Sequence, residues 1–158
     1  MVDTSELERI YEKYNSHERQ YLYLDTGDDK LTFTVKHRLN TEEITSITEY
    51  VCDRVVNEMT SEYHPELKDL CLRTAVIRTY TDICLPQDDN CLRLVYGTPI
   101  FAMITGHYRR PVVFDGRDYD ENMVIDVEQY EQIIAAIDQK IAYTLTRLAR
   151  SESPIRKE

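Results

Sequence analysis

An Asp-Thr-Gly triplet is the first stretch of this sequence whose residue types could do chemistry. Asp25, Thr26 and Gly27 follow the apolar-rich run at residues 21–24, an order typical of the catalytic loop of an aspartic protease. Such an enzyme needs two carboxylates that share a proton, and therefore a second loop or a dimer partner. The chain has no second Asp-Thr-Gly or Asp-Ser-Gly, and helical patterns dominate after residue 40, so we interpret the triplet as a turn.

The flanks of the triplet predict a β-hairpin. Apolar and polar residues alternate with period two over residues 31–36, as in a half-buried strand. Gly27 takes a positive φ without strain, and Asp25, Asp28 and Asp29 suit turn positions.

Cysteine and histidine offer a second possible chemistry. His64 and Cys71 are seven residues apart, which on one helix places them about 10 Å apart along the axis, too far for a hydrogen bond. The four cysteines, at 52, 71, 84 and 91, form no close pair of zinc ligands. We interpret them as buried small hydrophobes in a reducing cytosol. We predict no catalytic residue, no metal and no cofactor.

An acidic segment resembles half of a calcium loop. Asp118, Asp120 and Asn122 follow the Asp-x-Asp-x-Asn pattern, but Met123 and Gln129 occupy the positions that require glycine and glutamate. The calcium-loop interpretation therefore fails, and weak cation binding is left as an alternative.

Arginine and tyrosine suggest recognition rather than catalysis. The chain has twelve tyrosines and no tryptophan, and a tyrosine at a turn either packs at the edge of the core or contacts a partner. Arg109 and Arg110 beside Tyr108 form a short patch that binds a partner or pairs locally with Asp115. The candidate partner-binding residues are Tyr63, Tyr96, Tyr108, Arg109, Arg110, Asp118 and Asp120.

Composition narrows the function classes further. The net charge of −10 over 158 residues opposes direct binding to nucleic acid, because phosphates are repelled. Only four glycines are present, with no phosphate-binding loop and no Gly-x-Ser-x-Gly, so we do not expect an enzyme. No apolar run reaches the length of a membrane span or resembles a signal peptide, so we expect no membrane partner and a cytoplasmic location.

The elements that must position these residues are mostly helical. We predict one domain over residues 1–158, of α+β class and helix-rich, with about five helices packed with one or two small β-hairpins. The expected elements are a polar N-terminal helix over 5–18, a helix capped by Asn40 and running to Met59, a helix from Pro65 to about Thr81, short helices over 90–96 and 98–105, strands 112–114 and 123–125 paired across a loop, a helix of about 24 residues capped by Asp126, and a frayed tail over 151–158.

Two segments carry a resemblance to known proteins: residues 62–86, EYHPELKDLCLRTAVIRTYTDICLP, and residues 94–106, LVYGTPIFAMITG. They resemble small proteins of bacteriophage and prophage genomes, which are often encoded beside virion structural or assembly genes. The resemblance covers roughly residues 35–106 and consists of helix-core patterns. It implies an interaction protein and supplies no catalytic residues. It also implies that the cytoplasm is that of a host cell, with association with the virion as an alternative.

We therefore expect a non-enzymatic phage protein that binds another protein or a second copy of itself during virion assembly. The alternative is an anti-defence protein, similar in action to an anti-CRISPR protein, whose acidic face mimics nucleic acid and inhibits a host nuclease. That alternative predicts one continuous surface made by Asp25, Asp28, Asp29, Asp115, Asp118, Asp120 and Glu121. A third hypothesis, a small hydrolase, has no nominated site.

Overall fold

The structure, a computed structural model, describes residues 3–15, 20–25, 27–106, 112–114, 117–119 and 124–152. Within them the chain forms six α-helices, one short 3₁₀ helix and three two-stranded antiparallel sheets. The helices are α1 (Thr4–Asn15), α2 (Thr41–Val55), η1 (Pro65–Leu67), α3 (Lys68–Tyr80), α4 (Asn90–Gly97), α5 (Ile100–Thr105) and α6 (Val127–Glu152). The predicted helix-rich α+β class is confirmed, and each of the six α-helices falls on a segment expected to be helical, whereas the third small sheet was not expected.

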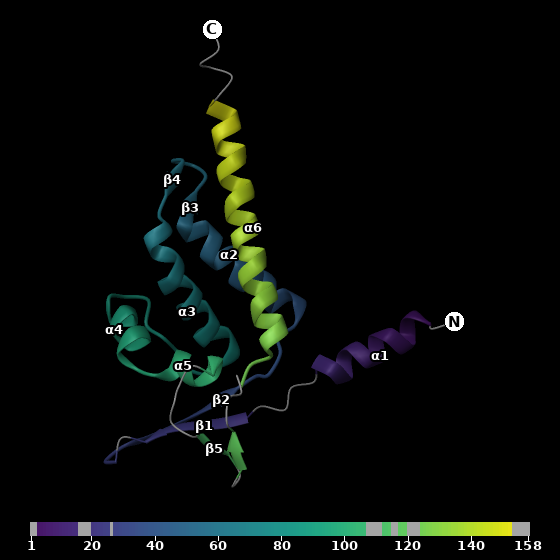
Figure 1. The fold of residues 1–158 in the computed structure, drawn as a ribbon, viewed down its shortest axis with the longest axis vertical. Helices are drawn as coiled ribbons and strands as arrows, with labels where there is room; N and C mark the ends of the chain where they lie inside the picture. The colour runs from purple at the N-terminus through teal and green to yellow at the C-terminus, as the bar shows by residue number, and fades with distance from the viewer. Residues whose placement is uncertain are drawn as a thin grey trace.

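Three helices make the centre of the molecule (Figure 1). Helix α2 packs against both α3 and α6. Helices α2 and α6 each turn an apolar stripe inward, whereas α3 is buried more broadly, with consecutive residues from Thr74 to Ile77 buried. The fully buried side chains at this junction include Ile47, Val51, Val55, Val76, Ile77, Tyr80, Ile133 and Ile137.

A β-hairpin forms on either side of the Asp-Thr-Gly stretch, as predicted, with Asp25 as the last residue of its first strand. Strands β1 (Gln20–Asp25) and β2 (Lys30–Val35) pair with Leu22 opposite Phe33, and both side chains are buried. Gly27 has φ +95°, which a residue with a side chain rarely adopts. The backbone N–H of Lys36 donates to the Tyr80 carbonyl over 2.7 Å, which ties the hairpin to the end of α3.

Helix α2 starts as predicted and ends early. Asn40 and Glu43 form a reciprocal capping box. The helix stops at Val55, so the prediction that it runs to Met59 is wrong. Strands β3 (Val56–Asn57) and β4 (Glu62–Tyr63) replace the last turn. The Asn57 side chain accepts from the backbone N–H of Met59 over 3.0 Å and stabilises the turn between these strands.

The predicted pairing of strands 112–114 and 123–125 is also wrong. Strand β5 (Val112–Phe114) pairs instead with β6 (Arg117–Tyr119), two residues further on. The intervening dipeptide is Asp-Gly, a strong hairpin signal that the longer-loop prediction overlooked. The backbone N–H groups of Val124 and Ile125 donate to the Ile104 carbonyl.

The last helix begins as predicted after Asp126, whose carboxylate accepts from the backbone N–H of Gln129 over 3.1 Å. It has 26 residues, and residues 151 and 152 of the predicted frayed tail belong to it, whereas 153–158 lie outside the described residues. Helix α5 ends at Gly106 with φ +79°, also as predicted. Among the helices described here, none combines the length and the apolar character needed to cross a membrane.

Candidate functional site

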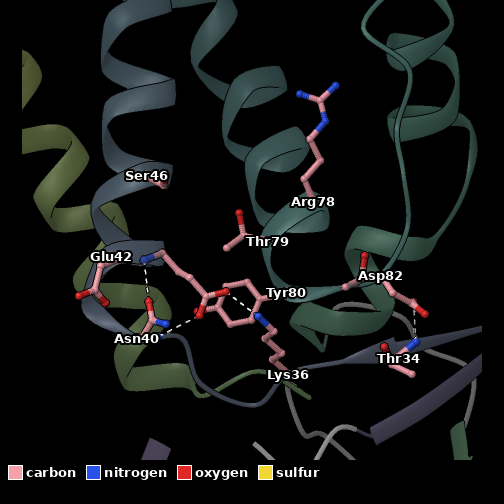
Figure 2. A pocket seen from close by; sticks show the side chains of 11 residues that line it. Thr34, Lys36, Asn40, Glu42, Ser46, Arg78, Thr79, Tyr80 and Asp82 are labelled. Carbon is pink, nitrogen blue, oxygen red and sulfur yellow. Dashed lines mark hydrogen bonds and ion pairs between the residues drawn. The ribbon is translucent and has the colours of Figure 1, made fainter.

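A polar pocket of about 530 Å³ opens between β2, the start of α2 and the end of α3 (Figure 2). Its lining residues supply hydroxyl, amide, carboxylate and cationic groups: Thr34, Lys36, Asn40, Glu42, Glu43, Ser46, Arg78, Thr79, Tyr80, Thr81 and Asp82. The pocket exists because the capping residues of α2 meet the last turn of α3 beside the hairpin.

The charges in this pocket hold the surrounding elements together. Lys36 Nζ donates to Glu43 Oε2 over 2.6 Å, and Asp82 Oδ1 accepts from the Thr34 backbone N–H over 2.8 Å. Arg78 points away from the Lys36–Glu43 pair (Figure 2) and donates to the carbonyl of Pro86 over 3.0 Å. A ligand entering the pocket would compete with these contacts.

Beneath the pocket, a glutamine joins three parts of the chain. The Gln129 side chain is 2% exposed. Its Oε1 accepts from the Leu39 backbone N–H over 2.7 Å and from the Tyr80 hydroxyl over 3.1 Å, while Nε2 donates to the Leu39 carbonyl over 3.0 Å. Burial raises the pKa of Tyr80, so its hydroxyl keeps its proton and serves as a donor. We call Gln129, Leu39 and Tyr80 the glutamine clamp.

Sequence reasoning missed the glutamine clamp. Gln129 entered that reasoning only as a failed calcium ligand, because its partner Leu39 is 90 residues away. The available signal was a glutamine three residues after the helix-capping Asp126, the spacing of a capping box.

A second pocket, of about 610 Å³, lies between α2, α3 and the segment that leads into α4, and two cysteines line it. Cys71 is buried, and burial raises the pKa of its thiol. The Thr74 hydroxyl lies 3.7 Å from Cys91 Sγ. The prediction that the cysteines are buried is confirmed for Cys52 and Cys71, whereas Cys91 is half-buried and Cys84 is exposed. Cys84 follows the end of α3, where no element covers it in the described part of the chain.

His64 lies between two glutamates. Its Nε2 is 3.1 Å from Glu62 Oε2, and its Nδ1 is 3.3 Å from Glu66 Oε1. The hydrogen bond with Glu62 raises the pKa of this histidine above its ordinary value. Across the described ranges, no group of three or more histidine, cysteine or acidic side chains is arranged to hold a metal ion.

Two of the predicted partner-binding residues, both tyrosines, have described side chains. Tyr63 on β4 and Tyr96 on α4 are each about half exposed. The Tyr96 hydroxyl donates to Asp69 over 2.6 Å, and burial together with this contact raises its pKa to about 12. Tyr96 therefore already has a partner within the chain.

Several predicted residues lie where the structure gives no side-chain description. The backbone of Asp118 is in β6, and its side chain is not described. Tyr108, Arg109, Arg110 and Asp120 lie outside the described residues, as do Asp115 and Glu121 of the expected acidic face. Of that face, Asp28 and Asp29 are exposed at the hairpin turn.

An apolar surface on α1 was not predicted as a site. Leu7, Ile10 and Tyr11 share one side of the helix, yet they are 61%, 57% and 46% exposed. We call these three residues the α1 face. It borders a gap of about 290 Å³ shared with Ile44 and the start of α6, and the Tyr11 hydroxyl lies 3.4 Å from that of Thr41. The sequence shows that these residues share one side of a helix. Buried core helices have the same spacing, so the spacing alone does not identify an exposed face.

Comparison of the chain with models of known protein families, with curated proteins and with solved structures finds no match.

Proposed function

We propose that this chain is a non-enzymatic binding protein that docks on another protein through the α1 face. The observation that supports the proposal most directly is the exposure of Leu7, Ile10 and Tyr11 on one side of one helix. Covering apolar surface contributes about 25 cal/mol per Å². Contiguous exposed apolar groups commonly mark a protein interface.

The position of α1 supports the same interpretation. Helix α1 extends to one side of the three-helix centre (Figure 1), whereas the buried residues of α2, α3 and α6 belong to one core cluster. Ile47, Val51 and Ile137 are almost completely buried, unlike the α1 face. A partner could therefore cover the exposed part of the α1 face, at the gap that it shares with Ile44 and the start of α6, without disturbing the core.

The resemblance to phage proteins extends the proposal to the class of partner. We take that partner to be a virion structural or assembly protein, with a second copy of this chain included. Recognition would then consist of binding alone, with no bond made or broken.

The test measures binding before and after the α1 face is made charged. Wild-type protein should self-associate in light scattering or bind a purified virion protein in a pull-down, and Leu7→Glu with Ile10→Glu should abolish that binding. Arg9→Glu is the matched control, because it changes the charge by the same amount on the opposite side of α1 and should leave binding intact. Equal binding by the double variant and the wild type, or no binding by the wild type, would contradict the proposal.

A further inference from the structure

The distal part of α6 carries a charge opposite to that of the whole chain. The net charge is −10, yet residues 140–151 contain three cations, Lys140, Arg147 and Arg150, and no carboxylate. A local cationic surface on an acidic protein attracts acidic partners and repels the cationic surfaces of competitors.

These cations lie together on one side of the helix. Lys140, Tyr143, Arg147 and Arg150 are separated by three, four and three residues, which places them along one face of α6. Tyr143 is 68% exposed, and the Arg147 guanidinium lies 6.0 Å from the centre of its ring. We call these four residues the cationic stripe.

The cationic stripe also has apolar surface beside it. Arg147 pairs with Glu58 in the turn between β3 and β4, and the next residue, Met59, is 94% exposed. Within the described residues, no carboxylate forms an ion pair with Lys140 or Arg150. The stripe therefore offers cations, an aromatic ring and a flexible methionine to a partner.

Helix α1, which carries the α1 face, complements this surface in charge and matches it in length. Residues 3–15 carry four acids, Asp3, Glu6, Glu8 and Glu12, against Arg9 and Lys13. Helix α1 has 12 residues, and 140–151 is a segment of the same number, so each is about 18 Å long. Acidic residues beside an apolar face complement cations beside Tyr143 and Met59.

Within one copy these two surfaces lie apart. The α1 face borders Gln129 and Gln132 in the first turns of α6, and the stripe begins eight residues after Gln132, about 12 Å further along the axis. Figure 1 shows α1 beside the N-terminal end of α6, with the distal end pointing away from it. This separation applies only within one copy, so the stripe of a second copy can reach the α1 face.

We propose that the α1 face of one copy docks on the cationic stripe of a second copy. This inference rests on the proposed function and names the partner and the receiving surface. The contact joins two different surfaces, so two joined copies leave one surface of each kind available, and assembly continues into an open chain or a closed ring of more than two copies.

The experiment mixes two variants that are each broken in one half of the contact. Leu7→Glu with Ile10→Glu removes the α1 face, and Lys140→Glu with Arg150→Glu reverses the stripe. In light scattering, wild type should form species larger than a dimer, and each variant alone should be monomeric. An equimolar mixture should form a dimer and nothing larger, because only one working surface of each kind remains.

Salt and a matched variant provide the controls. Raising ionic strength from about 0.01 to about 1 M shortens the screening length roughly tenfold and should weaken wild-type assembly. Lys30→Glu with Arg93→Glu makes the same charge change at exposed positions away from the stripe and should assemble as wild type does. Circular dichroism establishes that every variant is folded.

The outcomes separate this inference from the proposed function. Normal assembly by the stripe variant, together with loss of assembly in the α1 variant, overturns the inference and leaves docking through the α1 face intact. So does a wild type that stays monomeric but binds a virion protein through that face. A mixture that remains monomeric also overturns the inference.

Discussion

The glutamine clamp and the α1 face lie close together but differ in which kind of side chain is buried and which is exposed. At the clamp, Gln129 is 2% exposed and its side-chain oxygen and nitrogen both form hydrogen bonds with Leu39. At the α1 face, Leu7 is 61% exposed and Ile10 57%. A polar residue is buried in the first region, and apolar residues are exposed in the second.

The difference shows which of the two regions has its interactions satisfied within one copy of the chain. A buried polar group is stable only when its hydrogen bonds are satisfied, and the clamp satisfies them within one chain. An apolar face is stable when it is covered, and about half of the α1 face remains exposed to solvent. Internal contacts thus explain the clamp, and we infer that an external contact explains the α1 face.

The largest expected effect comes from breaking the clamp. Gln129→Ala leaves the Leu39 backbone groups and the Tyr80 hydroxyl without a partner, which should cost about 3 kcal/mol of unfolding free energy. Urea denaturation followed by circular dichroism measures it. Gln132→Ala, an exposed position one turn away, is the control and should change stability by less than about 0.5 kcal/mol. Equal effects would mean that the clamp does not hold the core.

Asp126, next to the clamp, predicts a pH dependence. Burial raises the pKa of this carboxyl, but the hydrogen bond from the Gln129 N–H and the ion pair with Arg38 outweigh it and leave the pKa below its ordinary value. The stabilisation is therefore present above an ordinary pKa of about 4 and is lost as pH falls through the folded-state pKa.

Asp126→Asn should accordingly cost about 1.5 kcal/mol near neutral pH, since a charged hydrogen bond is lost while the cap remains. The difference between variant and wild type should shrink below about pH 4. Urea denaturation across that range measures both. A gap that stays constant with pH would show that the carboxylate charge contributes nothing.

A smaller effect is expected at the start of α2. Asn40→Ala removes the capping bond to the Glu43 N–H, 2.8 Å long, and should cost about 1 kcal/mol. Ser46→Ala, further along the same helix and exposed, is the control. Thermal and urea unfolding of both variants measure the difference in stability. Equal stabilities would mean that the Asn40 cap does not stabilise the protein.

The smallest change in stability is expected at the α1 face. Leu7→Glu with Ile10→Glu should alter the unfolding free energy of dilute, unassociated protein by less than about 0.5 kcal/mol, because both side chains are largely in solvent. Urea denaturation at low concentration measures it. A decrease of several kcal/mol in the unfolding free energy would mean that these residues belong to the core. The α1 face would then not differ from the glutamine clamp in burial.

Local signals predicted most of the fold. The Asn40 capping box, the Asp126 cap and the glycine after α5 each act on residues within four positions in the sequence. The helices that they cap therefore begin or end as expected. The end of α2 and the partner of β5 were predicted wrongly. There, apolar periodicity was extended past Val55, and an Asp-Gly hairpin signal was overlooked.

The candidate sites were harder to predict than the fold. Tyr96 looked available for a partner, but Asp69, 27 residues away, binds its hydroxyl. The helix that carries Leu7 and Ile10 was predicted only as a polar N-terminal helix, and the exposure of these two residues depends on where α1 lies against the other helices. Such contacts join residues distant in sequence, which no local pattern encodes.

The sequence by itself determined the helix-rich class, the hairpin at Asp-Thr-Gly and the caps, because propensity, periodicity and turn chemistry act over a few residues. Only the tertiary structure decided that Gln129 is buried and Leu7 exposed. Burial depends on which surfaces meet across the whole chain, and the same helical spacing is compatible with either outcome.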